Sequence, residues 1–415
     1  MNFIKSSILS GISTIVKLIS NLVITKLVAF LYGAKGMFLL GNLANFLTFA
    51  RVLATGGVEQ GVVKYVAQNQ GKPDRQKLIV ANSVHLALIS STVLGLFLIL
   101  FRDSLSSYVM MSREFNYLFL VIGCTSVFFS INLIFLSILN GLKELKRFII
   151  INIAGNLFGL AITLILLYFF DLEGILLGFC INQSIVIVPT IFYVYRDWWI
   201  RASLKFNFQW SLQKDLFRYS IMAITSAITV PLTFFLIRRL ISLELGSEAA
   251  GMWEALVRIS AAFLMVLAAS YSTYLLPTFS ALKGKKLKHE LMNIYKIVIP
   301  VSMVGASMLY IFRDFVIIIL YSEDFLPISN VFIFQMLGDA IKAISLITGY
   351  LILSRGMVKA FIANEILQMV IYLGLTYTLI NNFKIEGATI AYFVTALSCF
   401  IYQLVLFRKV LWQQN

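Results

Sequence analysis

Apolar runs of about 20 residues follow one another along this chain, and they leave few folds open to it. A helix needs roughly 20 mostly apolar residues to cross a bilayer. The 415 residues are 60% hydrophobic and 13% charged, and the polar breaks between the runs are short. Soluble globular proteins do not have this composition. The sequence therefore predicts an all-α polytopic membrane protein with spans near 8–31, 37–63, 79–101, 116–140, 148–170, 174–195, 216–241, 251–278, 291–312, 327–353, 358–380 and 386–407.

Lysine and arginine are concentrated in alternate breaks between these spans. Breaks rich in these residues face the cytoplasm in membrane proteins. One set of breaks includes the runs around residues 72–77, 143–147, 196–214 and 283–288, whereas the other set is mixed with acidic residues. The first set is therefore expected on the cytoplasmic side, which also places both termini in the cytoplasm.

An internal repeat divides the spans into two sets of six. Lys26-Leu27 aligns with Arg239-Leu240, Gly33 with Gly246, and, after a two-residue insertion, Gly36-Met37 with Gly251-Met252. Halves that start on the same side of the membrane imply two bundles related by an axis along the membrane normal. We expect these bundles at residues 1–205 and 206–415, with the substrate between them. Pro231 and the pair Gly56-Gly57 interrupt spans and are candidates for bends in helices that line this cleft.

Several spans carry basic or amide side chains, which are costly in a bilayer and usually functional. Lys17 and Arg51 are expected near mid-bilayer with no acid nearby in the sequence, although both have the alternative of a structural role, which for Arg51 is bonding to carbonyl groups. Lys26 has the alternative of extending outward to the membrane surface. Arg238-Arg239 is explained either by interfacial anchoring or by a basic ring that both halves contribute. The candidate binding residues for an anionic substrate are Lys17, Asn21, Lys26, Arg51, Arg238, Arg239 and Arg258.

Acidic residues in the spans are candidates for ion coupling or gating. Asp339 and Lys342 share a helix face at i,i+3 spacing, so they are either a structural pair or a protonation switch. Glu365 has no partner close in the sequence, which makes it a candidate for reversible protonation. Glu254 is expected to pair with Arg258, and Glu59 with Lys64. The candidate coupling residues are Asp339, Lys342, Glu365, Glu59 and Glu254.

The absence of several motifs narrows the function. The sequence lacks a glycine-rich phosphate-binding loop, so no ATPase is expected. It also lacks a large external loop with paired carboxylates or histidines, as a membrane polymerase or ligase would need. The formal net charge of +15 is explained by the basic breaks rather than by nucleic-acid binding. A chain that is not an enzyme, with no cofactor and no metal site, is therefore predicted.

Five segments, taken in order along the chain, resemble one family. They are Ser13-Thr-Ile-Val-Lys17 with Lys26, Gly61-Val-Val-Lys-Tyr-Val-Ala-Gln68, Tyr274-Leu-Leu-Pro-Thr278, Phe312-Arg-Asp-Phe315, and Gly338-Asp-Ala-Ile-Lys342 with Gly349-Tyr350. Together they resemble the Wzx-type flippases, the translocases of O-antigen and enterobacterial common antigen, within the superfamily of multidrug, oligosaccharidyl-lipid and polysaccharide exporters (MOP). The resemblance implies the MATE-like fold of that superfamily, with two six-helix bundles.

The resemblance also implies a function in the bacterial inner membrane. The expected substrate is undecaprenyl pyrophosphate that carries a short oligosaccharide, moved from the cytoplasmic to the periplasmic leaflet by alternating access. By position, Lys17, Lys26 and Arg51 would meet the pyrophosphate, and Asp339 with Lys342 would be an acid–base pair. Expected partners are this lipid-linked glycan, the bilayer, the polysaccharide polymerase and the chain-length regulator. The alternative is a cation-coupled multidrug exporter of the same fold, which would favour acids over cations in its cavity.

Overall fold

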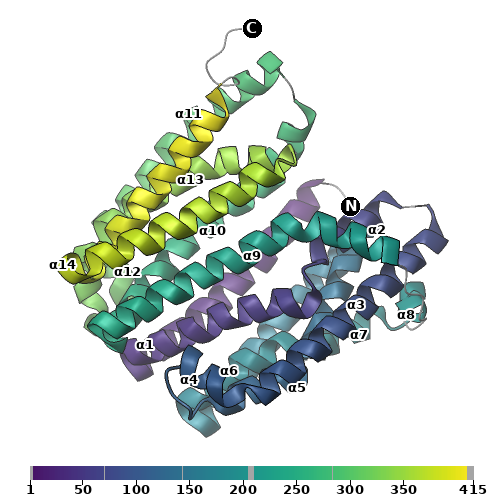
Figure 1. Ribbon diagram of the computed structural model, residues 1–415, viewed down its shortest axis with the longest axis horizontal. Helices are drawn as coiled ribbons and strands as arrows, with labels where there is room; N and C mark the ends of the chain where they lie inside the picture. The colour runs from purple at the N-terminus through teal and green to yellow at the C-terminus, as the bar shows by residue number, and fades with distance from the viewer. Residues whose placement is uncertain (1–2, 70, 143, 204–209, 283, 409–415) are drawn as a thin grey trace. The chain divides into compact units, whose positions relative to one another are not determined.

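The computed structural model describes residues 3–69, 71–142, 144–203, 210–282 and 284–408, and every regular element in these ranges is a helix (Figure 1). The elements up to residue 203 are α1 (Phe3–Thr55), α2 (Glu59–Gln68), α3 (Pro73–Leu100), α4 (Arg102–Val109), α5 (Asn116–Gly141), α6 (Leu145–Ile185), α7 (Ile187–Val194) and α8 (Trp198–Ser203). The elements that follow are α9 (Trp210–Leu245), α10 (Ser247–Ala281), α11 (Gly284–Ile311), α12 (Arg313–Leu320), the 3₁₀ helix η1 (Glu323–Val331), α13 (Phe332–Ser354) and α14 (Val358–Leu406).

Nine helices in the described part of the chain are long and apolar enough to cross a membrane. Three of these are broken internally by a residue with positive φ: Gly33 in α1, Asp171 in α6 and Lys384 in α14. Each of the three therefore supplies two consecutive spans joined by a turn of very few residues. Counted this way the helices give the number of spans that the apolar runs predict. The all-helical, multi-span fold is confirmed.

The turns between spans repeat along the chain. The same number of residues separates Gly33 from Gly246 as separates Asp171 from Lys384, and all four have positive φ. Helices α3 and α11 are both 28 residues long, and the short helices that follow them, α4 and α12, both have 8 residues. The internal repeat seen in the sequence is therefore also a repeat of helix lengths and turn positions.

The helices form two compact units, each with its own core. The first unit comprises Met1–Val28 and Asn42–Ile228. In its core, valines of α2 pack against α3 and against Ile134–Leu139 of α5. Trp199 of α8 is 1% exposed and meets the ring of Phe135 edge to face, with ring centres 5.1 Å apart. Large apolar side chains at helical spacing thus account for this core.

The second unit comprises Ala29–Gly41 and Thr229–Asn415, so it includes the turn region of α1. Phe38 packs in one cluster with Ile237, Trp253 and Tyr392. A Cβ atom on Gly251 would lie 1.7 Å from the carbonyl oxygen of Ala34, so only glycine permits this close approach of α10 to residues 29–41. The predicted bundle boundary between residues 205 and 206 falls outside the described residues and stays a prediction.

Of the two predicted bends, one marks the end of a helix. Gly56 and Gly57 have φ of 61° and 68° and separate α1 from α2, so the second span ends at Thr55 rather than at residue 63 as predicted. Positive φ is costly for other residues, which explains the glycine pair. Pro231 lies inside α9, and the helix continues beyond it.

Candidate functional site

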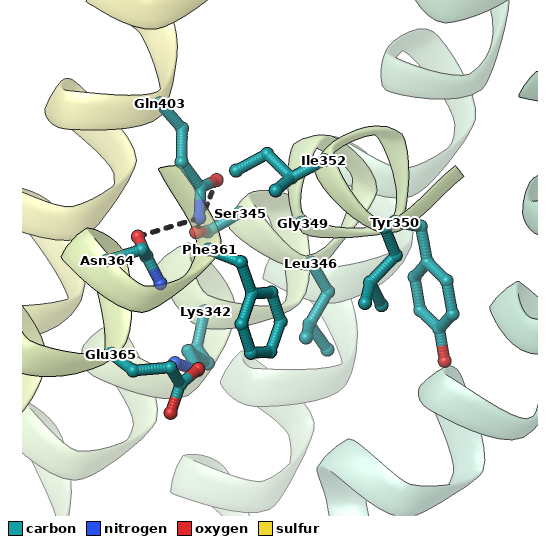
Figure 2. A pocket seen from close by; sticks show the side chains of 11 residues that line it. Lys342, Ser345, Leu346, Gly349, Tyr350, Ile352, Phe361, Asn364, Glu365 and Gln403 are labelled. Atoms are coloured by element: carbon teal, nitrogen blue, oxygen red, sulfur yellow. Dashed lines mark hydrogen bonds between the residues drawn. The ribbon is translucent and has the colours of Figure 1, made fainter. Parts of the chain in front are cut away.

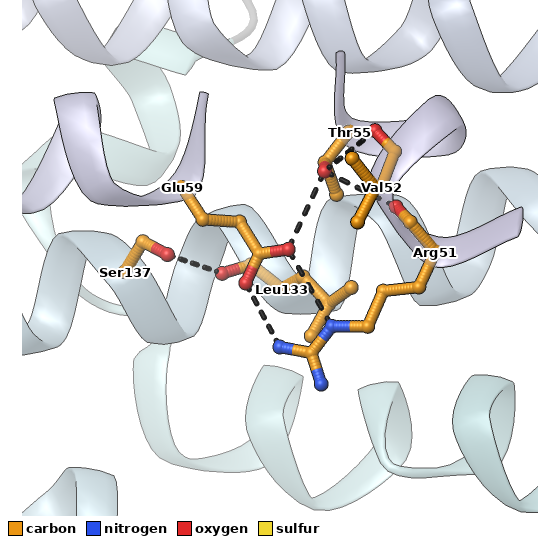
Figure 3. Close-up of polar contacts among 6 residues, drawn as sticks. All are labelled: Arg51, Val52, Thr55, Glu59, Leu133 and Ser137. Carbon is orange, nitrogen blue, oxygen red and sulfur yellow. Dashed lines mark hydrogen bonds and ion pairs between the residues drawn. The ribbon is translucent and has the colours of Figure 1, made fainter. Parts of the chain in front are cut away.

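Arg51 lies near the C-terminal end of α1 and forms an ion pair with Glu59 in the first turn of α2 (Figure 3). Its Nη2 is 2.8 Å from Glu59 Oε2, and its Nε is 3.5 Å from Glu59 Oε1. The hydroxyl of Thr55 donates to the same carboxylate at 3.4 Å. Arg51, expected near mid-bilayer with no acid nearby in the sequence, thus has an acidic partner eight residues further on. The Gly56-Gly57 break turns the chain and brings these two side chains together. The predicted pairing of Glu59 with Lys64 stays a prediction; the side chain of Lys64 lies outside the described residues.

Lys17, Asn21 and Lys26 are all exposed on α1. Lys17 and Asn21 are four residues apart and share one face of the helix, whereas Lys26 lies on the other side. The charges of Lys17 and Arg51 are close enough to repel each other. The first unit therefore brings Lys17, Arg51 and Glu59 into one group in which positive charge is in excess.

The second unit contains a buried triad of Arg238, Glu254 and Arg258. Arg238 of α9 donates from Nη2 to Glu254 Oε2, and Arg258 Nε donates to Glu254 Oε1 at 2.8 Å. The side chains of Arg238 and Glu254 are 1% and 6% exposed, and that of Arg258 is 22% exposed. The predicted Glu254–Arg258 pair is confirmed, and Arg238 is a buried member of the same group. The neighbouring Arg239 is half-buried. Its place in a basic ring that both halves contribute stays a prediction.

Three neighbours hold this triad in place. Gly41 lies so close that a Cβ atom there would be 2.6 Å from the carboxyl carbon of Glu254 and 2.8 Å from the guanidinium carbon of Arg238. The Arg238 guanidinium lies 5.8 Å from the centre of the Trp253 ring. Burial raises the pKa of Tyr321, and its protonated hydroxyl donates to the carbonyl of Ala255 at 2.8 Å, fixing α10 beside Glu254.

Asp339 does not pair directly with Lys342, which corrects the expectation that the two side chains touch. Asp339 is fully buried, and its Oδ1 accepts hydrogen bonds from Ser260 at 2.5 Å and from Tyr392 at 2.8 Å. Lys342 instead donates to the side-chain oxygen of Gln368. The two charges attract each other only at longer range. Asp339 is thus held by hydroxyl groups from two other helices.

Lys342 and Glu365 line the polar end of a cavity of about 170 Å³ between α13 and α14 (Figure 2). The charge of Lys342 attracts Glu365, and the hydroxyl of Thr229 lies 3.5 Å from the Glu365 carboxylate. Glu365 has no partner close in the sequence, but the fold brings Lys342 and Thr229 near its carboxylate.

Sequence reasoning missed the neutral residues around these charges. Ser260, Tyr392 and Gln368 hold Asp339 and Lys342, and Gly41 leaves room for the triad. Ser260, Tyr392 and Gly41 could not be recognised from the sequence, because serine, tyrosine and glycine are common in apolar helices. Gln368 lies three residues after Glu365 on the same helix, and a search for amide groups one turn from an acid could have found it.

Three comparisons with known proteins agree with this architecture. A lipid III flippase of Escherichia coli (strain K12) is 27% identical over 397 residues, which cover 95% of both chains, and a lipid III flippase of Shigella flexneri matches equally well. Among solved structures, an inward-facing MATE family multidrug resistance transporter of the MOP superfamily aligns with a TM-score of 0.82 at 15% identity, covering 95% of both chains. A MATE structure in the straight conformation aligns with a TM-score of 0.73 at 16% identity, covering 98% of this chain and 96% of the other.

These matches settle the fold and the family. The structural likeness spans nearly the whole chain, so the predicted MATE-like fold is confirmed, and with it the prediction of a multi-pass membrane protein. The profile of the family described as polysaccharide biosynthesis protein matches residues 3–283, well over half of the sequence. The chain therefore belongs to the polysaccharide biosynthesis protein family.

Proposed function

We propose that this protein is a flippase that moves an undecaprenyl-pyrophosphate-linked oligosaccharide from the cytoplasmic to the periplasmic leaflet of a bacterial inner membrane. The observation that carries the proposal is the similarity to the lipid III flippase of Escherichia coli along 95% of both chains. The bilayer holds the polyprenyl tail while the polar headgroup crosses inside the protein. The polysaccharide polymerase and the chain-length regulator are proposed partners after translocation.

The charge distribution supports a phosphate-bearing substrate. Lys17 and Arg51 are accompanied by the single carboxylate of Glu59, and the triad contains two arginines for the one carboxylate of Glu254. Diphosphates are bound most strongly by charge-assisted hydrogen bonds, and arginine can bond two phosphate oxygens at once. In this proposal Glu59 holds the Arg51 guanidinium in position, and Lys17 supplies a second positive charge. Asn21, Lys26, Arg239 and Arg258 are proposed as further contacts along the path of the headgroup.

Asp339 is the proposed coupling residue. Glu59 and Glu254 each hold arginines, so their protonation would release those cations as well. Asp339 accepts hydrogen bonds from hydroxyl groups of α10 and α14, so a change in its charge would alter contacts among three helices at once. Such a group can link ion binding to a change of conformation.

Complementation of a strain that lacks a defined flippase tests the proposal. Wild-type protein should restore surface glycan and lower the amount of lipid-linked intermediate inside the cell. Lys17→Ala with Arg51→Ala should accumulate in the membrane but leave the intermediate in the cytoplasmic leaflet, whereas Lys17→Arg should retain transport. Lys35→Ala is the matched control, because Lys35 is 70% exposed and pairs with the similarly exposed Glu248. Normal glycan export by the double variant at matched protein level would refute the cationic mechanism.

The alternative of a multidrug exporter rests on the shared fold. Such an exporter would be expected to lower the accumulation of cationic dyes in cells, and a lipid flippase would not. Dye efflux by the protein, without any effect on surface glycan, would favour the alternative.

A further inference from the structure

The cavity between α13 and α14 has a polar side and an aromatic side (Figure 2). Lys342, Glu365 and Asn364 form the polar side, and Phe361 and Tyr350 belong to the other. Leu353, which also lines the cavity, is 40% exposed, so the cavity is open where Leu353 lies. Binding pockets for small molecules commonly combine an apolar wall with a few fixed polar groups.

A hydrogen-bond network fixes the amide groups of this cavity. Gln403 Oε1 accepts hydrogen bonds from Ser345 at 2.9 Å and from Thr348, and Gln403 Nε2 donates to Asn364 Oδ1 at 3.2 Å. The oxygen of Asn364 therefore faces Gln403, and its amide nitrogen lies on the side away from Gln403 (Figure 2). Asn364 thus presents N–H donors to the cavity, Lys342 presents an ammonium group, and Glu365 presents an acceptor.

The charges and the size of the cavity define the class of ligand. One ammonium and one carboxylate make the lining electrically neutral, so a free anion or a free cation gains little there. A cavity of about 150 Å³ in another protein binds benzene, so about 170 Å³ has room for one six-membered ring. Donors and an acceptor on one side and aromatic side chains on the other suit a ring with hydroxyl groups at its edge and C–H groups on its face.

We propose that this cavity binds one sugar residue of the lipid-linked glycan and is a specificity subsite of the second unit. The inference rests on the proposed function, because only a glycan-bearing substrate brings a sugar to this place. Asn364 and Lys342 donate to ring hydroxyl groups, Glu365 accepts from one, and Phe361 covers the face of the ring. A site built to hydrogen-bond a hydroxyl group discriminates strongly against substrates that lack it.

Gly349 offers a variant that fills the cavity without disturbing the fold. It lines the cavity, and a Cβ atom there would meet no atom within 4 Å. Leucine is also a better helix former than glycine, so Gly349→Leu should fold at least as well as the wild type. Gly374→Leu is the matched control, since Gly374 is a helical glycine of α14 that likewise has no atom within 4 Å of an added Cβ and does not line the cavity.

The experiment measures binding to the full-length protein in lipid nanodiscs. The probes are bare undecaprenyl pyrophosphate and four derivatives that carry one hexose, one N-acetylhexosamine, one 6-deoxyhexose or one hexuronic acid. Wild type and Gly374→Leu should bind at least one sugar-bearing lipid about tenfold more tightly than the bare lipid, the gain expected from one or two net hydrogen bonds. Gly349→Leu should lose this preference and bind the bare lipid as before.

The possible outcomes separate the two proposals. If the wild type binds the bare lipid but prefers none of the four derivatives, or if Gly349→Leu keeps the preference, the sugar subsite is refuted and the proposed function stands. If the wild type binds none of the five lipids, the proposed function fails and the subsite fails with it.

Discussion

Glu254→Gln should destabilise the second unit strongly, because it removes the only carboxylate of the Arg238–Glu254–Arg258 triad. Arg238 and Glu254 are almost fully buried. Removing one partner of such a pair leaves the other charge unpaired and costs about 3–5 kcal/mol. Glu59→Gln is the comparison, because the Arg51–Glu59 pair is 42% and 21% exposed and pairs with this exposure contribute about 1 kcal/mol or less. The two conservative substitutions should therefore differ by at least about 2 kcal/mol.

Denaturant unfolding of the purified protein in detergent, followed by tryptophan fluorescence, measures this difference. A double variant, Arg238→Met with Glu254→Met, should be less destabilised than Glu254→Gln alone, because it deprives only the partly exposed Arg258 of its partner, whereas Glu254→Gln also leaves the fully buried Arg238 unpaired. Gly41→Ala perturbs the same triad without changing any charge, and forcing a methyl group against it should cost about 1–3 kcal/mol. If Glu254→Gln costs no more than Glu59→Gln, or if the double variant shows the sum of the single effects, the triad does not act as a buried unit.

Three further predictions concern the backbone, the second unit and the topology. Asp171→Gly should raise the free energy of unfolding by about 1 kcal/mol in the same assay, because Asp171 has φ of 50° and glycine adopts positive φ without strain. A loss of stability would show that contacts of the Asp171 side chain contribute more to stability than its backbone strain costs. Asp339→Asn and Lys342→Met should each reduce transport, and their effects should multiply in the double variant, since the two side chains bond to different partners. A double variant that transports better than either single variant would support a direct Asp339–Lys342 pair. A cysteine at position 286, in place of Lys286, should be shielded from an impermeant thiol reagent added outside the cytoplasmic membrane, because lysine-rich breaks face the cytoplasm. A cysteine in place of Ser104 should react, and the reverse pattern would refute the predicted orientation.

The spans could be predicted from the sequence because each depends on a local property, a run of apolar residues of sufficient length. Their ends were harder to predict. The second span was expected to continue to residue 63, but Gly56-Gly57 ends it at Thr55. The turns at Asp171 and Lys384 have positive φ without glycine, and the sequence carries no local signal for a backbone conformation that these residue types rarely adopt.

The charged residues inside the spans could also be found in the sequence, since ionisable groups in apolar spans are rare, and their roles in binding and coupling stay predictions. Their partners were predicted only where they lie one turn apart, as for Glu254 and Arg258. Glu254 meets Arg238 from another helix, and Asp339 meets Ser260 and Tyr392 from two others. Such contacts depend on how the helices pack, so spacing along the chain could not give them, and for Asp339 and Lys342 the spacing suggested a contact that the fold does not make.

The internal repeat shows whether the fold itself requires charged residues at the positions of Lys342 and Asp339. Helix α5 ends at Gly141 and its counterpart α13 ends at Ser354; counted back from these ends, Lys342 matches Phe129 and Asp339 matches Ser126. Phe129 is 3% exposed and packs as an ordinary apolar residue. The same backbone position is therefore stable without a charge, and an ionisable group inside a span costs a few kcal/mol or more. Since packing does not require Lys342 or Asp339, their cost is best explained by the proposed transport, which makes the second unit the place to look for coupling and for recognition of the proposed glycan substrate.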